Sequence, residues 1–548
     1  MSKKLIIVLS LLLTMALLAS CATGNNTKPD TTAAVSTDQE ASVEPSTIEK
    51  TTMTMMLVNE NDHPFTDIKT NAFTVWMEQQ TGVHLEFTIL EKDVAQEKLA
   101  LSLNSGNYTD MIAVNITHDN LNLYGMDSKL LIPLNKYIEN STYYKKVTER
   151  YPTLVTDLKL SDGNIYGMCG AQDMFHSMEK SGKLYINVNW LKKLGLSMPT
   201  TTEEFANVLR AFRDNDPNGN KNKDEIPMSG CVPDWASYPH LMLMNAFCYF
   251  PDWWSMSYCN KNGEIIGVFE QDGFKEGLKY IAGLYAEGLI DPASYTQNND
   301  DFEAQLADCN SIGAFNKGHM GTSFYNVDAK AYDLVLPLKG PSGRQGLPWS
   351  DEVIETSAKF VITDKCKDPD RAFAWADFLF SDEASWNQYY GPKGVLWDYA
   401  DSGTTLKGTK AEFVQLKSSF AEDTDLNNRW GFQRLGQHDF ETRMAVSGDI
   451  YALENYIQRL GAQSQEYAKY AVDTSFNLPI VKDTDEESQL KTSLQKYYQQ
   501  AITEFIAGRR SIDKDWDKFI ADLKNLKWDR WLEIYKENYT LSKYYKGN

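Results

Sequence analysis

In the first folded part of the chain, segments with the hydrophobic pattern of β-strands alternate with segments in which apolar residues recur at the spacing of an α-helix. Short apolar runs have the length and composition of buried strands, and the apolar residues between them recur at helical spacing. The expected order is strand Thr51 to Val58, helix through Phe73, Trp76 and Met77, strand His84 to Ile89, helix Val94 to Leu103 and strand Asp110 to Val114. This alternation predicts a parallel sheet covered by helices. Such sheets bind ligands at the carboxyl ends of their strands, here the loops Asn59 to Phe65 and Asn115 to Asn120.

The clearest amphipathic helix lies further along, between Thr201 and Phe212. From Phe205 onward its apolar side chains recur at i, i+3, i+4 and i+7, which predicts one buried face. Thr200 is expected to cap the helix, with Glu203 at the third helical position of a capping box.

A twelve-residue segment that follows this helix, Asp214 to Glu225, fits the calcium-loop pattern D-x-[DN]-x-[DN]-G-x5-E without a mismatch. The expected ligands are Asp214, Asp216, Asn218, Asn220 through its backbone carbonyl, Asn222 directly or through water, and Glu225 as a bidentate carboxylate. Gly219 supplies the sharp turn. The alternative is a solvated, Asn-rich surface turn. A single loop of this kind indicates a structural Ca2+ clamp rather than a sensor.

The N-terminal segment has the features of an export signal. Residues 1–20 carry two lysines followed by an apolar run, which is too short for a membrane-spanning helix and predicts a signal peptide. Leu18-Ala19-Ser20-Cys21 resembles the lipobox of bacterial lipoproteins, so Cys21 is expected to be lipidated; an ordinary secretory cleavage site is the alternative. Residues 21–50 are nearly devoid of large apolar side chains and are expected to form a disordered tether.

Length, charge and cysteine usage bound the remaining possibilities. The part of this 548-residue chain after residue 50 exceeds the natural size of one core, so at least two lobes are expected. A formal net charge of −21 disfavours nucleic acid and anionic membrane as partners. Six cysteines follow Cys21 without metal or disulfide spacing, and they are expected to be mainly core thiols; a Cys248–Cys259 pair is the alternative.

Signatures of enzymes are absent from the sequence. It contains no G-x-S-x-G, H-E-x-x-H, G-x-x-x-x-G-K-[ST] or G-x-G-x-x-G motif, and its seven histidines lack metal-ligand spacing. With 75 acidic residues, any pair at the separation used by glycosidases carries no information. No catalytic residue is expected.

Aromatic residues in loops are the candidates for ligand binding, because sugar rings stack on flat side chains and their hydroxyls need charged or amide partners. The aromatic candidates are Trp235, Tyr238, Trp254, Phe324, Tyr325, Trp349, Trp397 and Trp430. The polar candidates are Asp351, Arg429 and His63. Ordinary packing is the alternative for each of these side chains. A further set in helical patterns is expected to pack in cores or between helices: Trp76, Trp190, Trp375, Trp386, Trp516, Trp528 and Trp531.

A series of short landmarks carries a family resemblance over residues 51–540. They are Leu131 to Asn135, Asp162 to Gly167, Leu184 to Asn187, Trp190 to Leu196, Asn316 to Met320, Leu336 to Pro341, Asp368 to Phe373, Phe505 to Gly508 and Asp515 to Asp517. In their order and spacing the chain resembles the extracellular solute-binding lipoproteins of ABC transporters, the group that includes maltose-binding protein. More narrowly it resembles the long LplA-like carbohydrate-binding branch of Gram-positive bacteria. His319 and the six cysteines depart from the family pattern.

The resemblance implies a type II periplasmic-binding-protein-like fold, with two α/β lobes and a hinge that the chain crosses repeatedly. The implied division is 51–182 and 353–390 for the first lobe, and 183–345 and most of 391–548 for the second. The implied function is a lipid-anchored protein on the outer face of the cytoplasmic membrane, which captures an oligosaccharide in an aromatic-lined interlobe cleft and delivers it to ABC permease subunits. The alternatives are a receptor of the same fold for peptides or other small solutes, and a secreted carbohydrate-active enzyme.

Overall fold

The computed structural model describes residues 50–541, with gaps. The gaps are 60–67, 92–93, 157, 171–181, 233, 235, 261, 319–329, 349–357, 406, 418–441, 447, 449–465, 468–469 and 471–484. All described elements belong to one compact unit, Glu49–Asn548.

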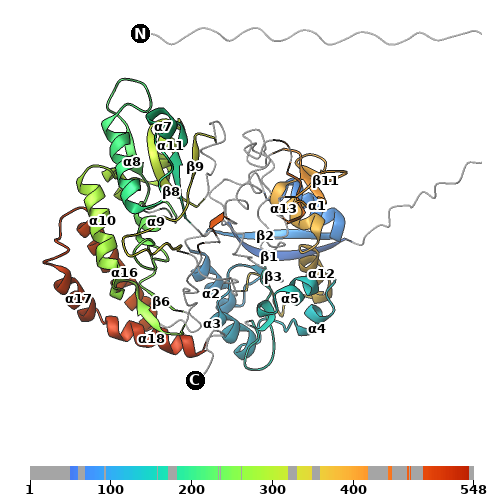
Figure 1. Cartoon of the computed structure of the whole chain (residues 1–548). Helices are drawn as coiled ribbons and strands as arrows, with labels where there is room; N and C mark the ends of the chain where they lie inside the picture. The colour runs from blue at the N-terminus through green and yellow to red at the C-terminus, as the bar shows by residue number, and fades with distance from the viewer. Residues whose placement is uncertain are drawn as a thin grey trace, which may run out of the picture. The chain divides into compact units, whose positions relative to one another are not determined.

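The first sheet has four strands in the order β10-β3-β1-β2. Its strands are β1 (Thr51–Asn59), β2 (Val83–Glu91), β3 (Met111–Ala113) and β10 (Val361–Ile362). β1 lies parallel to both β2 and β3, which confirms the parallel sheet predicted for the first part of the chain. β10 is antiparallel to β3 and comes from far downstream. The chain therefore returns to this sheet after building the second one (Figure 1).

Local residues explain where the first helix begins and ends. α1 (Ala72–Thr81) is capped by Asn71, whose side-chain oxygen accepts hydrogen bonds from the backbone N–H groups of Phe73 and Thr74 at 3.0 and 3.1 Å. It ends at Gly82, which adopts a left-handed conformation with φ of 69°. The helix therefore ends in a glycine C-cap.

A core around the first sheet combines residues from two distant stretches of sequence, between Met53 and Cys169 and between Ala358 and Ala384. The helices near it are α2 (Ala95–Ser105), α3 (His118–Leu121), the π-helix η2 (Asn122–Asp127), α4 (Asn135–Glu139), α5 (Tyr144–Arg150), α6 (Thr153–Thr156), α12 (Pro369–Phe378) and α13 (Asp382–Tyr390). Buried Asp377 of α12 ties the two stretches together. Its carboxylate accepts hydrogen bonds from the backbone N–H groups of residues 142–144, at the start of α5, including one of 2.7 Å from Tyr144.

The second sheet is mixed and has the order β5-β8-β4-β9. Its strands are β4 (Lys183–Asn187), β5 (Ile226–Ser229), β8 (Ile312–Lys317) and β9 (Tyr332–Val335). β5 runs parallel to β8, while β4 is antiparallel to both β8 and β9. Every residue of β4 and β8 is buried.

A second core surrounds this sheet and includes the C-terminal helices. Its elements are α7 (Val188–Leu194), α8 (Thr202–Asp214), α9 (His240–Met244), β6 (Ser257–Cys259), β7 (Ile265–Gly267), η4 (Val268–Glu270), α10 (Phe274–Ala286), η5 (Pro292–Tyr295), α16 (Asp485–Ile506), α17 (Trp516–Asn525) and α18 (Trp528–Leu541). α11 (Asn299–Leu306) packs in a smaller cluster with residues of β4, β8 and β9. α10 packs against α16 although the two are far apart in sequence, as Figure 1 shows in green and red. Two separate sheets, each with its own core, are what a two-lobed α/β fold requires. The lobe boundaries stay a prediction.

A small antiparallel pair, β11 (Trp397–Tyr399) and β12 (Phe413–Gln415), packs against α13. The rings of Trp386 and Phe413 stack with centroids 3.9 Å apart, and Trp397 is fully buried beside them.

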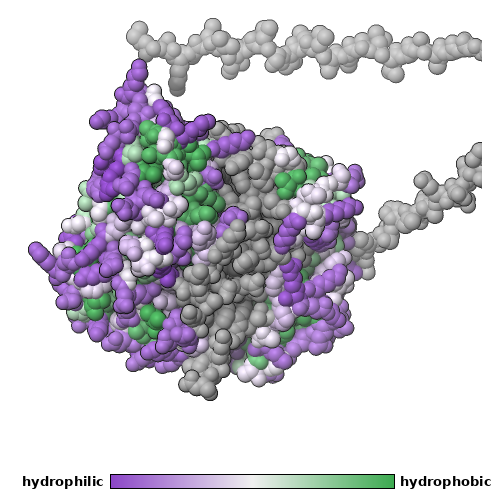
Figure 2. Space-filling model, in the orientation of Figure 1, coloured by the Kyte–Doolittle hydropathy of each residue, from purple (hydrophilic) through white to green (hydrophobic). Residues whose placement is uncertain are grey.

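The described residues show the state of the cysteines and the polarity of the surface. None of the six cysteines after Cys21 is joined in a disulfide; five are buried and Cys366 is half-buried, as expected for core thiols. Among the described helices none combines the length and apolarity needed to span a membrane. In the coloured part of Figure 2 hydrophilic residues predominate, with hydrophobic residues gathered in patches among them.

Candidate functional site

Helix α8 leads into the candidate calcium loop, and its start differs by one residue from the sequence prediction. The cap is Thr201 rather than Thr200, and the third helical residue is Glu204 rather than Glu203. Thr201 accepts the N–H of Glu204 at 3.1 Å, and the Glu204 carboxylate accepts bonds from the N–H groups of residues 200 and 201. Two adjacent Thr and two adjacent Glu residues allow both registers in the sequence. The structure selects the later one.

In the first part of the loop, side-chain oxygens accept hydrogen bonds from backbone N–H groups of the same loop. The carboxylate of Asp216 accepts the N–H groups of Gly219 and Lys221 at 2.7 and 3.2 Å. The side-chain oxygens of Asn218 and Asn220 each accept the N–H group two residues further on. Gly219 has φ of 83°, as the sharp turn requires.

The last residue of the loop supplies the observation that fits a cation best. Both carboxylate oxygens of Glu225 are buried and have no hydrogen-bond partner among the described residues. Burying a carboxylate without partners is costly, so this group needs a positive charge. Twelve-residue calcium loops place a bidentate glutamate at this position.

Other ligands are engaged elsewhere in this conformation. The carboxylate of Asp214 accepts two hydrogen bonds from the guanidinium of Arg213, at 2.7 and 3.0 Å, and this contact lowers its pKa. In the described part of the chain no group of three or more His, Cys, Asp or Glu side chains is positioned to hold a metal ion. Asp214 must therefore leave Arg213 before it can act as a ligand.

Most of the predicted ligand contacts lie outside the described residues. These are Trp235, Phe324, Tyr325, Trp349, Asp351, Arg429, Trp430 and His63, together with the predicted lipidation site Cys21. Three predicted contacts are described: Tyr238, Trp254 and Trp397.

Two of those three are core residues in this structure. Tyr238 is fully buried, and its hydroxyl accepts the N–H of Trp253 at 2.9 Å. Trp397 is also fully buried, with its indole N–H directed to Asn387 and Gly391. Neither ring turns a face to solvent. Trp254 differs, because 39% of it is exposed.

The carboxyl end of β3 presents a polar group that sequence analysis placed in a ligand loop. The side-chain oxygen of Asn115 is buried and has no partner within the described residues. Its backbone carbonyl accepts a bond from Gln96 at 2.8 Å, which fixes this loop to α2. An unpartnered acceptor at this edge of a parallel sheet is placed to meet a ligand.

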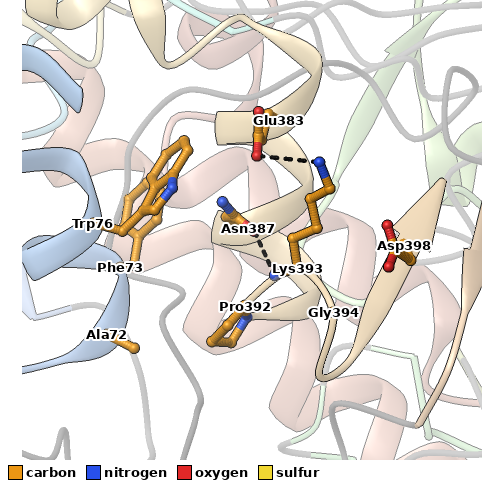
Figure 3. A pocket seen from close by; sticks show the side chains of 9 residues that line it. All are labelled: Ala72, Phe73, Trp76, Glu383, Asn387, Pro392, Lys393, Gly394 and Asp398. Atoms are coloured by element: carbon orange, nitrogen blue, oxygen red, sulfur yellow. Dashed lines mark hydrogen bonds and ion pairs between the residues drawn. The ribbon is translucent and has the colours of Figure 1, made fainter. Parts of the chain in front are cut away.

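A pocket of about 420 Å³ lies between α1, α13 and β11 (Figure 3). It is lined by Ala72, Phe73, Trp76, Glu383, Asn387, Pro392, Lys393, Gly394 and Asp398. Trp76 was predicted to pack between helices, and its indole does stack against Phe378, with ring centroids 5.7 Å apart. The same side chain also lines the pocket, which was not predicted. Helical periodicity carries no signal that could have found this, because the opposite wall comes from residues 383–398.

The chain is similar to known proteins along most of its length. The family described as bacterial extracellular solute-binding protein matches residues 62–386. The fructooligosaccharide ABC transporter substrate-binding protein FusA of Streptococcus pneumoniae is 26% identical over 487 residues, covering 84% of this chain and 85% of FusA. Lipoprotein LipO of Bacillus subtilis is 22% identical, covering 79% and 82% of the two chains. A structure of an EF-hand mutant of FusA in complex with fructo-nystose superposes with a TM-score of 0.70 at 21% identity, covering 90% of this chain and 99% of that one.

Proposed function

Because this chain belongs to the bacterial extracellular solute-binding proteins, we propose that it captures an oligosaccharide outside the cell and delivers it to an ABC permease. The observation that carries the proposal is the alignment with FusA along most of both chains, since FusA is named for fructooligosaccharides. The unpartnered acceptor of Asn115 and the exposed indole of Trp254 support it, because a sugar needs both polar and flat partners.

Capture works by closure of the two lobes around the ligand. Each lobe has its own sheet and core, so it can move as a rigid body while the connecting segments absorb the rotation. The ligand favours the closed form only to the extent that it makes contacts absent from the open form. The permease then binds the closed form that carries the ligand.

Calorimetric titration tests this function. The purified chain without residues 1–20 is titrated with short fructooligosaccharides, with a panel of other neutral oligosaccharides and with oligopeptides. Saturable binding of an oligosaccharide is expected. Binding of peptides, with none of the sugars bound, would overturn the proposal, and slow cleavage of a bound sugar would assign the chain to the enzymes instead.

The proposed location is the outer face of the cytoplasmic membrane of a Gram-positive bacterium. Lipidation of Cys21 supplies the anchor, and residues 22–50 supply the tether. The likeness to a protein named lipoprotein supports this placement, as does the lipobox-like sequence at residues 18–21.

We further propose that Asp214 to Glu225 binds a structural calcium ion. Asp216, Asn218, Asn220 and Asn222 offer oxygen atoms along the loop, while Glu225 closes it with its unpartnered carboxylate. The ion supplies the positive charge that this buried carboxylate lacks. Since the loop joins the end of α8 to the start of β5, the bound ion braces these two elements.

A further inference from the structure

The pocket between α1, α13 and β11 has one aromatic wall and one polar wall. Trp76 and Phe73 of α1 form the first, and the indole of Trp76 faces the pocket across from α13 (Figure 3). Glu383 and Asn387 of α13 stand opposite, and the turn Pro392 to Gly394 leads to Asp398 on β11. A volume of about 420 Å³ lies within the range of small-molecule sites.

Asn387 of α13 offers a hydrogen-bond donor of fixed orientation to this pocket. It is only 4% exposed. Its side-chain oxygen accepts two hydrogen bonds, from the indole N–H of Trp397 at 3.1 Å and from the backbone N–H of Lys393 at 3.0 Å. The amide orientation is therefore fixed, because a flipped amide would turn its NH2 group toward two donors.

This orientation leaves the Asn387 nitrogen as an unused donor. It has no hydrogen-bond partner within the described residues, and Figure 3 shows it directed to the side where Trp76 stands. Because no described protein group accepts from this nitrogen, it can donate to a ligand that enters the pocket. A ligand with an acceptor oxygen would satisfy it.

The rim adds charges of both signs. The ammonium group of Lys393 lies 3.7 Å from the carboxylate of Glu383 and 4.1 Å from the centre of the Tyr399 ring. Asp398 contributes a second carboxylate, one of whose oxygens accepts the N–H of Tyr399 at 2.8 Å. Two carboxylates against one ammonium disfavour an anionic ligand. Groups that both donate and accept hydrogen bonds, such as sugar hydroxyls, suit this mixture.

Rigid packing holds the aromatic wall in place. The Trp76 ring stacks with the rings of Phe73 and Phe378, with centroid distances of 6.1 and 5.7 Å. Since this side chain is already held in place, ligand binding loses little conformational entropy here. An immobilised indole beside hydrogen-bonding groups is a suitable platform for the C–H face of a sugar ring.

We propose that this pocket binds one neutral glycosyl unit of the captured oligosaccharide, with Asn387 donating to a ring or hydroxyl oxygen, Asp398 and Glu383 accepting from hydroxyls, and Trp76 covering the apolar face. The inference rests on the proposed function of the chain. It adds a specific subsite between α1, α13 and β11, which none of the sequence motifs indicated.

The test compares Asn387→Asp, Asp398→Asn and Asp401→Asn with the unchanged chain by titration against whichever oligosaccharide the latter binds. Asn387→Asp keeps the oxygen that accepts from Trp397 and Lys393 but replaces the free donor with an acceptor, so a loss of affinity of roughly tenfold or more is expected. Asp398→Asn, at the rim, should cost about threefold to tenfold. Asp401→Asn, on an exposed residue just beyond β11, should have no effect.

Each outcome decides the inference. Selective loss in the first two variants, with melting curves that show intact folding, supports it. Equal affinity in Asp398→Asn and in a folded Asn387→Asp would overturn the subsite while the oligosaccharide function stands. An unchanged chain that binds no sugar of the panel would remove both.

Discussion

Glu225→Gln distinguishes a calcium-binding loop from an ordinary surface turn. If the loop binds calcium, the variant should change the free energy of unfolding in opposite directions in EDTA and in calcium. In the chain without calcium, both Glu225 oxygens are buried without a partner among the described residues. Replacing the charge by an amide removes a buried charge whose cost is about 1–3 kcal/mol or more. The variant should therefore be at least as stable as the parent when EDTA is present.

With calcium the order reverses. A ligand at 100 times its dissociation constant stabilises the folded state by about 2.7 kcal/mol, and the variant forfeits most of this because it lacks the bidentate carboxylate. The expected result is a crossing: the variant is equal or better in EDTA and worse by about 2 kcal/mol or more in saturating calcium.

Scanning calorimetry in about 10 mM CaCl2 and in about 1 mM EDTA measures this crossing, because about 10 mM calcium is about 100 times the dissociation constant of an extracellular site of about 0.1 mM. The matched control is Glu203→Gln, which removes the same charge from an exposed position on α8. Superimposable curves of the parent chain in the two buffers would refute the brace, as would a calcium response in Glu225→Gln equal to that of the parent.

Three further changes test other parts of the structure. His240 is fully buried, both of its ring nitrogens lack partners among the described residues, and burial lowers its pKa from 6.5 to about 3. Because the unfolded chain protonates first, stability should fall as the pH drops below about 6.5, by about 2 kcal/mol at pH 5, and His240→Phe should remove this part of the acid slope in urea titrations. Asp377→Ala leaves the N–H groups at the start of α5 without their acceptor, so urea unfolding should show a loss of about 2–4 kcal/mol, whereas exposed Asp370→Ala on the same helix should lose far less. Cys21→Ala should move the chain from the membrane fraction to the culture medium, and a chain that stays membrane-bound would contradict the lipid anchor.

The order of elements in the first sheet followed from the sequence because each signal is local. Apolar runs and helical spacing lie within single elements. The structure confirms β1 and β2 with ends that differ by two residues or fewer, and it confirms a helix, α1, that contains the predicted residues Phe73, Trp76 and Met77. The antiparallel edge strand β10 could not be predicted in this way. It has two residues, and its place beside β3 depends on the fold of the entire stretch between them.

The ligand candidates show a different limit. A loop aromatic looks the same in sequence whether it faces solvent or packs inward, and Tyr238 and Trp397 both pack inward because they meet aromatic neighbours from other segments. Trp76 shows the converse, since its helical position suggested packing while part of its ring lines a pocket. In each case the deciding contacts join residues that only the fold brings together.

The position of the calcium loop limits the effect that calcium can have on ligand binding. The loop ends at Glu225, and β5 begins at the next residue and pairs in parallel with β8. Beyond the loop, Ser229 at the end of β5 is held independently, since its hydroxyl lies 3.2 Å from both Asp291 and Gln305. Loss of the ion removes the brace at Glu225, while β5 stays paired with β8 from Ile226 onward and Ser229 stays anchored at its end. Calcium removal should therefore lower the melting temperature of the chain while the ranking of oligosaccharides by affinity stays the same; a changed ranking in EDTA would show that the ion shapes the binding site itself.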